Sequence, residues 1–379
     1  MWPHLLAGKI PMPSGLRKRA DKIIRAAAKL NKDELTRLAA SIDASVVQKL
    51  DQFQRGVGFY QNHNFTRPKP RAKIIAQNGR IKLWDYGAKS KYAPAVFIIP
   101  SLVNRAYILD LRADKSFVQF LKNHGLRPLL LDWGEPGARE KLFTMDDYFT
   151  IAAELFAAIP PAYHKRRKPI IAGYCMGGVF AAALALHNPG AYSALLAMAT
   201  PWDFKSGFSD GDKIAFYLKN TLPSFAESGL IPVDVLQSMF YQIDPMLVVK
   251  KFEKLGRQKP DKAELDNFAA LEDWINDGVP LAYHVMHECL DGWYVKNLTA
   301  AKKFRMGGKI IDPGKIAKPA MVVIPQNDRI VPPKSAMKLA RQIPGATIFT
   351  AQTGHIGMVA SNYAKSQLWP QIIHWLQKI

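Results

Sequence analysis

The pattern of apolar and polar positions changes three times along the 379-residue chain. From Leu16 to Phe53, apolar residues recur at helical spacing opposite a basic face, with a break allowed at Asn31. From about Val96, short apolar runs alternate with helical stretches; this alternation stops near Asp203 and resumes at Pro319. Such alternation is typical of a mostly parallel sheet with helices on both faces.

These apolar runs also predict individual strands and helices. Two alternating segments flank Asn78-Gly79, which is the strongest short signal for a β-hairpin. Strands are expected at residues 95–100, 126–133, 168–174, 194–200, 319–325 and 346–351. Helices are expected at residues 113–124, 146–159, 176–187, 334–342 and 361–377.

The interruption of this alternation suggests a domain organisation. We expect a basic helical segment at 1–59, a core at 60–204, a cap insertion at 205–305 and the rest of the core at 306–379. The insertion is richer in aromatic residues and Met and contains no evident buried strand. The N-terminal helix has two interpretations: it packs on the main domain with its basic face in water, or it docks on a partner or an anionic surface.

Composition narrows the class of protein. The 52 Lys and Arg residues outnumber the 31 Asp and Glu residues, and the net charge of +21 favours polyanionic ligands. No zinc finger or RNA-recognition motif accompanies the basic clusters, so we expect no nucleic-acid partner. The two cysteines cannot form a disulfide framework or a cysteine-rich zinc site, which indicates a reducing, intracellular setting. We also expect no secretory leader and no membrane span.

One short stretch carries the candidate chemistry. Residues Gly173 to Gly177 read G-x-C-x-G between an expected strand and an expected helix, which is the nucleophile elbow with cysteine in place of serine. The helix that follows would direct its N-terminal N–H groups at the Cys175 sulfur and favour the thiolate. The alternative is a buried structural cysteine with glycines for close packing.

The order of two later residues favours the catalytic interpretation. Asp328 follows an apolar strand and His355 follows the next one, which is the order nucleophile, acid, histidine of an α/β-hydrolase fold. His355 would take the thiol proton, Cys175 would attack an acyl carbonyl and Asp328 would orient the imidazole. Asp203 is an alternative acid.

The oxyanion of the attacked carbonyl needs two N–H donors. We expect the backbone N–H groups of Met176 and Leu102 to supply them. A thiol nucleophile also suggests acyl exchange between sulfurs, because the thioester on Cys175 stays activated for a second acceptor. Transfer is therefore favoured over hydrolysis, although cysteine hydrolases exist.

Several separate blocks make the sequence resemble the polyhydroxyalkanoate synthase family, from about Tyr60 to the C-terminus. These blocks are "PSLVNRAYILDL", "LLLDWGEP", "FTMDDYF", "GYCMGG", "GWYVKNLTAAKKFRMGGKIIDPGKI", "NDRIVPP" and "TGHIG". The short N-terminal part is similar to the shorter synthases that work with a second subunit. The basic segment up to about Arg55 has no match that we can place.

The resemblance implies a cytoplasmic bacterial enzyme that polymerises (R)-3-hydroxyacyl-CoA at a polymer granule, releases CoA and uses no cofactor or metal. It places the family's catalytic residues on Cys175, Asp328 and His355, and it implies a homodimer and a second subunit or granule protein as partners. Arg329 and Pro333 stand where the family usually has histidine and tryptophan. The alternatives are a polyester depolymerase or thioesterase on the same scaffold, and a non-catalytic granule protein.

Other polar and reactive residues have less specific settings. Cys289 has no elbow and is expected to be a buried cap residue. His284 and His287 precede it at helical spacing without further ligands. Asp132 and Trp133 follow a strand directly and either line the pocket or pack.

Overall fold

The computed structural model describes residues 14–207 and 211–379, and the chain divides into two compact units. The smaller unit combines the chain up to Asn64 with Pro245–Ala269, and the larger unit comprises Phe65–Asp244 and Ala270–Ile379. Residues 1–13, in which we expect no leader, lie outside the described residues. Within the described ranges, no helix is long and apolar enough to cross a membrane.

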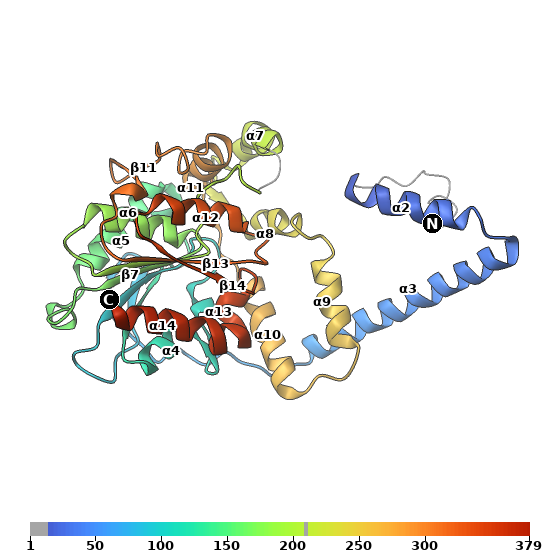
Figure 1. Cartoon of the computed structure of the whole chain (residues 1–379), viewed down its shortest axis with the longest axis horizontal. Coiled ribbons are helices and arrows are strands. Elements are labelled where there is room, and N and C mark those ends of the chain that lie inside the picture. The colour runs from blue at the N-terminus through green and yellow to red at the C-terminus, as the bar shows by residue number, and fades with distance from the viewer. Residues whose placement is uncertain (1–13, 208–210) are drawn as a thin grey trace. The chain divides into compact units, whose positions relative to one another are not determined.

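An eight-stranded sheet forms the centre of the larger unit (Figure 1). Its strands lie in the order β1 (Lys73–Asn78), β2 (Ile81–Asp85), β6 (Arg127–Asp132), β3 (Ala95–Ile99), β7 (Ile170–Tyr174), β8 (Ala194–Met198), β13 (Ala320–Pro325) and β14 (Thr347–Ala351). The first three strands pair antiparallel and the others pair parallel. The predicted hairpin is confirmed: Asn78 pairs with Ile81, and Gly79 makes the turn at φ +59°.

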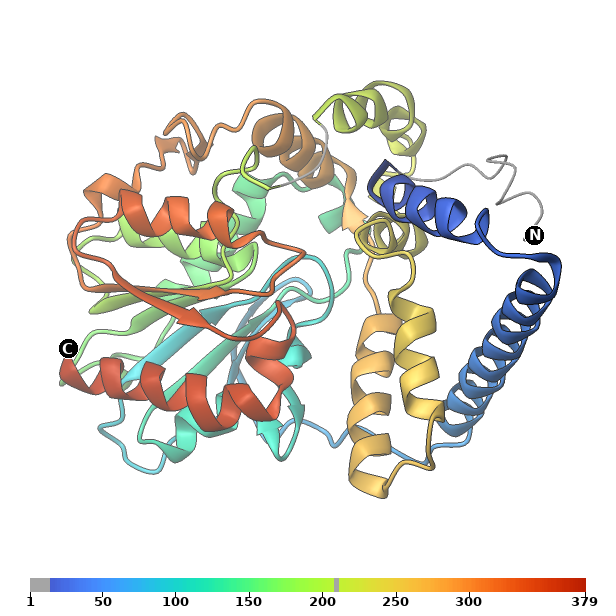
Figure 2. The same ribbon diagram turned by 45° about the vertical axis from the view of Figure 1, so that its right-hand side comes forward.

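Helices cover both faces of this sheet, as the sequence predicted (Figures 1 and 2). One face packs against α5 (Met145–Ala157), α6 (Gly177–His187) and α12 (Pro333–Gln342). The other packs against α4 (Phe117–Asn123), α13 (Gly357–Ala360) and α14 (Trp369–Lys378). Strands β3, β7, β8 and β13 are buried throughout, which explains why their sequences are continuous apolar runs.

Three expected elements differ from the structure. Helix α4 begins at Phe117, because Lys115–Ser116 pair with Asp110–Arg112 as a short strand and the Ser116 side chain caps the helix. The closing helix covers residues 362–378, close to the expected 361–377, and differs only in a π-helical segment at Ala364–Leu368 before α14 begins at Trp369.

The third difference lies in the expected cap. This region contains α7 (Gly211–Asn220), α8 (Val233–Tyr241), α11 (Tyr283–Glu288) and a π-helical turn at Cys289–Val295. It also holds a two-stranded pair, β9 (Leu230–Ile231) with β10 (Leu281–Ala282), so the expectation of no buried strand was wrong. Runs of two residues are too short to give a strand signal. The cap limits of 205–305 stay a prediction.

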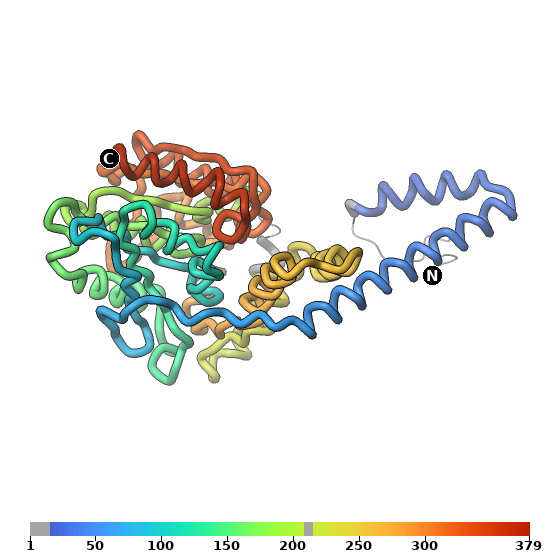
Figure 3. The backbone as a smooth tube through the Cα atoms, turned by 90° about the horizontal axis from the view of Figure 1, so that it is seen from below, coloured from blue at the N-terminus to red at the C-terminus, as the bar shows by residue number. Residues whose placement is uncertain are grey.

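The smaller unit is helical. Helix α2 (Ser14–Ala27) and helix α3 (Lys32–Gln61) are joined by a turn at Asn31 (Figure 3, blue). The Asn31 side chain accepts the N–H of Glu34, and the Glu34 carboxylate accepts the N–H of Asn31, both at 2.9 Å. This capping box confirms the predicted helix with a restart near Asn31.

Helix α3 packs on α9 (Leu247–Gly256) through two glycines. A Cβ on Gly56 would lie 2.0 Å from the Phe252 carbonyl oxygen, and a Cβ on Gly256 would lie 1.8 Å from that of Gln52. The absence of side chains therefore lets the two backbones approach. Beside this crossing, edge-to-face ring contacts join Phe252 to Phe53, Tyr60 and Phe268, the last from α10 (Lys262–Asn276).

Candidate active site

Cys175 occupies the turn between strand β7 and helix α6. Its φ is +55°, in the left-handed region that non-glycine residues rarely adopt. The Cys175 N–H donates to the Met198 carbonyl at 2.8 Å, and the Cys175 carbonyl accepts the Gly178 N–H at 2.9 Å. The residue is half-buried. The turn thus holds a strained cysteine at the carboxyl end of a central strand, in the manner of a nucleophile elbow.

Close backbone approach explains the glycines of this turn. A Cβ on Gly173 would lie 2.5 Å from the Gly177 carbonyl oxygen. A Cβ on Gly177 would lie 2.0 Å from the carbonyl oxygen of Ile99, the last residue of β3. A Cβ on Gly178 would lie 1.8 Å from Oγ1 of Thr200. The start of α6 is therefore pressed between the loops that follow β3 and β8.

Asp328 and His355 lie together at this end of the sheet. The Nδ1 atom of His355 donates to Oδ2 of Asp328 at 2.7 Å, and both side chains are buried. The other carboxylate oxygen, Oδ1, accepts the N–H groups of Ile330 and Val331, each at 2.8 Å. The carboxylate is thereby fixed in orientation and in turn fixes the imidazole.

The imidazole of His355 also interacts with Cys175. Burial alone would lower the pKa of His355, but the charge and hydrogen bond of Cys175 and the hydrogen bond and charge of Asp328 raise it to about 10. His355 is thus hydrogen-bonded to Asp328 and interacts electrostatically with Cys175. Such an arrangement can hold a proton on the imidazole next to a sulfur nucleophile.

The two expected oxyanion donors lie near the elbow. Leu102 and Met176 both have buried side chains. The carbonyl oxygens of Ile99 and Pro100 lie against Gly177, so the loop after β3 runs beside the start of α6. In the described part of the chain, the N–H groups of Leu102 and Met176 make no backbone hydrogen bond. Their role as oxyanion donors remains a prediction.

The π-helical turn at Cys289–Val295 brings the cap region near this site. Burial raises the pKa of Tyr294, which belongs to this turn, and the charges of Cys289 and Cys175 raise it further. Cys289 itself is buried, and burial followed by the charge of Glu288 raises its pKa well above the ordinary value. A buried, protonated Cys289 is an inert residue, as its sequence setting indicated.

The alternative acid, Asp203, is hydrogen-bonded to other residues than His355. Asp203 accepts hydrogen bonds from Ser206 Oγ at 2.7 Å and Asn297 Nδ2 at 2.9 Å. Burial would raise its pKa, but these hydrogen bonds hold the pKa below its ordinary value. Asp203 therefore ties the loop after β8 to residues around Asn297, while the imidazole is bound by Asp328.

The two departures from the family pattern have local explanations. Arg329 is exposed and forms a 2.8 Å ion pair with Asp244. Pro333 is the first residue of α12, where a fixed φ and a missing N–H are favourable.

The other residues singled out in the sequence have structural contacts. Trp133 is buried against Tyr148 and Phe180, and the Asp132 carboxylate accepts the Gly134 N–H at 3.1 Å. His284 and His287 lie beside the Tyr283 ring. Among the residues that the structure describes, no group of three His, Cys, Asp or Glu side chains could hold a metal ion.

One residue of the site was missed by sequence reasoning. Tyr174 precedes the cysteine; its hydroxyl donates to the His355 carbonyl at 3.2 Å, and its ring lies 5.3 Å from the imidazole. Burial raises its pKa well above the ordinary value, with further contributions from Cys175 and Asp328. As the last residue of a buried apolar strand, Tyr174 gives no signal in the sequence that separates it from the core.

The sheet and the elbow define an α/β-hydrolase fold with cysteine at the nucleophile position. The solved structure of BpoC from Mycobacterium tuberculosis H37Rv is similar, with a TM-score of 0.52 and 15% sequence identity over 84% of this chain and 98% of that one. This similarity confirms the fold predicted from the sequence.

Comparison with characterised families then shows what the chain is similar to: proteins named poly(3-hydroxyalkanoate) polymerase. The family described as Poly-beta-hydroxybutyrate polymerase (PhaC) N-terminus matches residues 34–121. Poly(3-hydroxyalkanoate) polymerase subunit PhaC of Haloferax mediterranei is 27% identical over 80% of this chain and 63% of its own length. The subunit of the same name from Thiocystis violacea is 27% identical over 83% of this chain and 89% of its own length.

The resemblance inferred from the sequence blocks is therefore confirmed by the family match and by the names of these relatives. The family match starts at residue 34, in α3, earlier than the expected start near Tyr60. A helical repeat of apolar residues carries no recognisable motif, which is why the earlier part of the match was missed. The chain spans just under two thirds of the Haloferax protein.

Proposed function

We propose that this chain is an acyltransferase that polymerises (R)-3-hydroxyacyl-CoA, with Cys175 as the nucleophile. The proposal rests on one observation: at one end of the sheet, His355 interacts with Cys175 and is bonded to Asp328 at 2.7 Å. The names of the relatives supply the substrate class.

The first half-reaction transfers the acyl group to the protein. The Cys175 thiolate attacks the thioester carbonyl carbon, and the oxyanion is held by the N–H groups of Met176 and Leu102. When the intermediate collapses, the bond to the CoA sulfur breaks and the His355 imidazolium donates its proton to that sulfur. The products are free CoA and an acyl thioester on Cys175.

The second half-reaction extends the chain. The 3-hydroxyl group of another hydroxyacyl unit loses its proton to His355 and attacks the acyl carbonyl on Cys175, forming an ester and releasing the sulfur. Asp328 stabilises the imidazolium that forms. A thioester on Cys175 suits this step because it remains activated until a hydroxyl arrives.

The setting of this reaction follows from the same proposal. The chain would act in the cytoplasm at the surface of a polyester granule, as a homodimer or with a second subunit. The relatives carry the word subunit in their names, which favours such a partner. The net charge of +21 suits a substrate with CoA phosphates.

The test is incubation of the purified chain with (R)-3-hydroxybutyryl-CoA, with free thiol and product size measured together. Release of CoA with polymer supports the proposal. Release of CoA with only free acid identifies a hydrolase, and absence of polymer both alone and with a candidate second subunit contradicts the synthase assignment. Unchanged properties in Cys175→Ala would indicate a non-catalytic granule protein.

A further inference from the structure

The loop that follows β3 is held at both ends by tryptophan indoles. Trp133, after β6, donates from Nε1 to the Pro100 carbonyl at 3.1 Å. Trp274, near the end of α10, donates from Nε1 to the Arg105 carbonyl at 2.9 Å. Both tryptophans are buried. The residues between these two bonds include Leu102, whose N–H is the expected second oxyanion donor.

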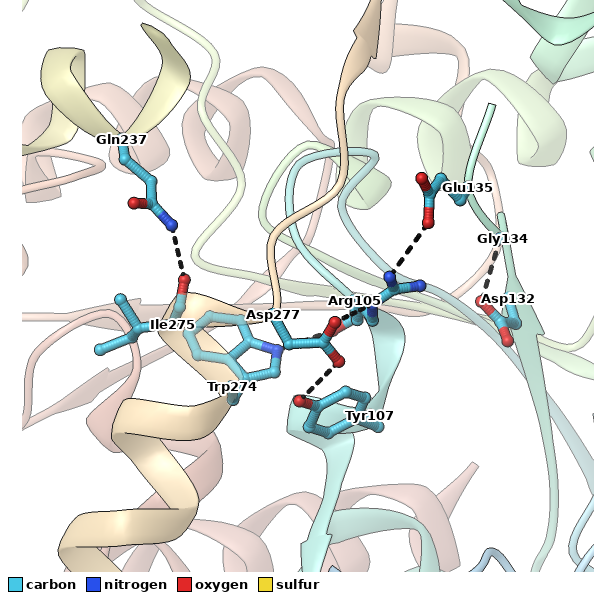
Figure 4. A network of polar contacts seen from close by, with 9 residues as sticks. All are labelled: Arg105, Tyr107, Asp132, Gly134, Glu135, Gln237, Trp274, Ile275 and Asp277. Atoms are coloured by element: carbon cyan, nitrogen blue, oxygen red, sulfur yellow. Dashed lines mark hydrogen bonds and ion pairs between the residues drawn. The ribbon is translucent and has the colours of Figure 1, made fainter. Parts of the chain in front are cut away.

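The side chain of Arg105 extends this attachment to two further segments (Figure 4). Its Nε donates to Oδ1 of Asp277 at 2.7 Å, and its Nη2 donates to Oε2 of Glu135 at 3.2 Å. The other oxygen of Asp277 accepts the Tyr107 hydroxyl at 3.0 Å. The end of α10, the loop after β6 and the loop after β3 therefore meet at one guanidinium.

The geometry of the loop shows why it needs such attachment. Asn104, directly before Arg105, has φ +69°, in the left-handed region, where asparagine marks a tight turn. On its other side, the Ser101 hydroxyl accepts the Val103 N–H at 3.1 Å and tightens the turn around Leu102. The two tryptophan bonds fix the ends of this turn.

Stability alone does not explain the ion pairs. The side chains of Arg105 and Asp277 are 30% and 45% exposed. Ion pairs this open to water contribute little to folding, typically below about 1 kcal/mol. Their distinguishing feature is their position, because they join the residues after α10 to the loop that carries Leu102.

We infer that Arg105 is a positioning residue for acyl transfer: together with Asp277 and Trp274 it sets the Leu102 N–H in the place where an oxyanion forms. This inference rests on the proposed role of Cys175. The expected effect of losing it is selective. Attack on a carbonyl needs the oxyanion donor, whereas alkylation of the same sulfur by iodoacetamide creates no oxyanion.

The experiment compares these two reactions of Cys175 in the full chain. Acylation is followed with (R)-3-hydroxybutyryl-CoA and with p-nitrophenyl butyrate, and alkylation with iodoacetamide. In Arg105→Met and Asp277→Asn, acylation by both reagents should slow about tenfold, while alkylation keeps the wild-type rate. Arg105→Lys, which restores one ion pair, should recover part of the loss.

Lys262→Met is the matched control, because it removes a 2.8 Å ion pair of comparable kind, with Asp266, from the beginning of the same helix. It should change neither rate. Equal slowing of acylation and alkylation in both Arg105→Met and Asp277→Asn, or no slowing of acylation in either, overturns the inference. A wild-type protein that reacts with p-nitrophenyl butyrate but not with the CoA thioester refutes the proposed function and leaves this comparison intact.

Discussion

Asp328 binds His355 with one carboxylate oxygen and holds two backbone N–H groups with the other. The Oδ2–Nδ1 distance is 2.7 Å, and the Oδ1 distances to the N–H groups of Ile330 and Val331 are both 2.8 Å. Because Nδ1 is engaged, the second ring nitrogen of His355 is left for Cys175. The carboxylate thus determines which nitrogen faces the sulfur.

This arrangement predicts an unusual titration. The pKa of His355 is raised to about 10, so the imidazole should keep its proton at pH 8, where an ordinary histidine has lost it. Asp328→Asn removes the carboxylate charge and weakens the hydrogen bond, so the midpoint should fall. Histidine side-chain NMR measures this titration midpoint. A range of roughly pH 5–11 covers both the ordinary histidine pKa and the raised pKa of His355.

The control for this titration is Asp203→Asn, because Asp203 bonds Ser206 and Asn297 rather than the imidazole. It should leave the midpoint unchanged. A wild-type midpoint near that of a free histidine would refute the proposed contact of His355 with Cys175.

The two cysteines should differ sharply in reactivity. Cys175 is half-buried beside His355, whereas Cys289 is buried with a raised pKa. In the native protein, iodoacetamide should modify Cys175 at least about tenfold faster, since the thiolate is the nucleophile. Peptide mapping after timed alkylation measures both rates.

The matched variants complete this comparison. Cys175→Ala should abolish CoA release, and Cys289→Ala should retain it. If Cys289→Ala folds normally but no longer releases CoA, Cys289 rather than Cys175 would be the nucleophile.

The glycine at the start of α6 should be intolerant of a methyl group. In Gly177→Ala, Cβ would meet the backbone oxygen of Ile99 at 2.0 Å, and neither a rotamer change nor side-chain motion relieves this contact. We expect a loss of about 3 kcal/mol in the free energy of unfolding. Urea denaturation measures it, and Gly190→Ala, with no atom near its Cβ, should change it by under about 0.5 kcal/mol. Equal effects of the two substitutions would contradict the packing.

The helix crossing in the smaller unit provides a second test of packing. Gly56→Ala would place Cβ 2.0 Å from the Phe252 carbonyl oxygen and force α3 away from α9. Gly58, two residues further along α3, has no atom near its Cβ, so Gly58→Ala should stabilise the helix by about 1 kcal/mol. Limited proteolysis of the N-terminal region should accelerate in Gly56→Ala and slow in Gly58→Ala. Acceleration in both would indicate that the crossing is not formed.

Sequence patterns predicted the sheet, both helix layers and the positions of Cys175, Asp328 and His355 because each depends on local order. An apolar run of five residues defines β7, and a polar residue after a buried strand must lie at its end. The glycines on either side of Cys175 indicated the tight turn in which the cysteine lies. The order of these segments was sufficient to expect that the three side chains meet.

The attachment of the loop after β3 could not be predicted in this way. Arg105 and Asp277 are 172 positions apart, and each alone is an ordinary charged loop residue. Gly56 and Gly256 are farther apart still in the sequence, and glycine in a helix gives no sign of what it faces. The contact of Tyr174 with His355 could not be predicted either, because Tyr174 ends a buried apolar strand and looks like a core residue. Contacts between distant segments depend on packing, which a single sequence does not display.

The central claim is that Cys175 carries the growing acyl chain as a thioester. Brief incubation with (R)-3-hydroxybutyryl-CoA, acid quenching and peptide mass spectrometry test it most directly. The account predicts a ladder of hydroxybutyryl units on the peptide that contains Cys175, removed by hydroxylamine and absent in Cys175→Ala. Release of CoA with the acyl group on another residue, or on none at any time, would contradict it.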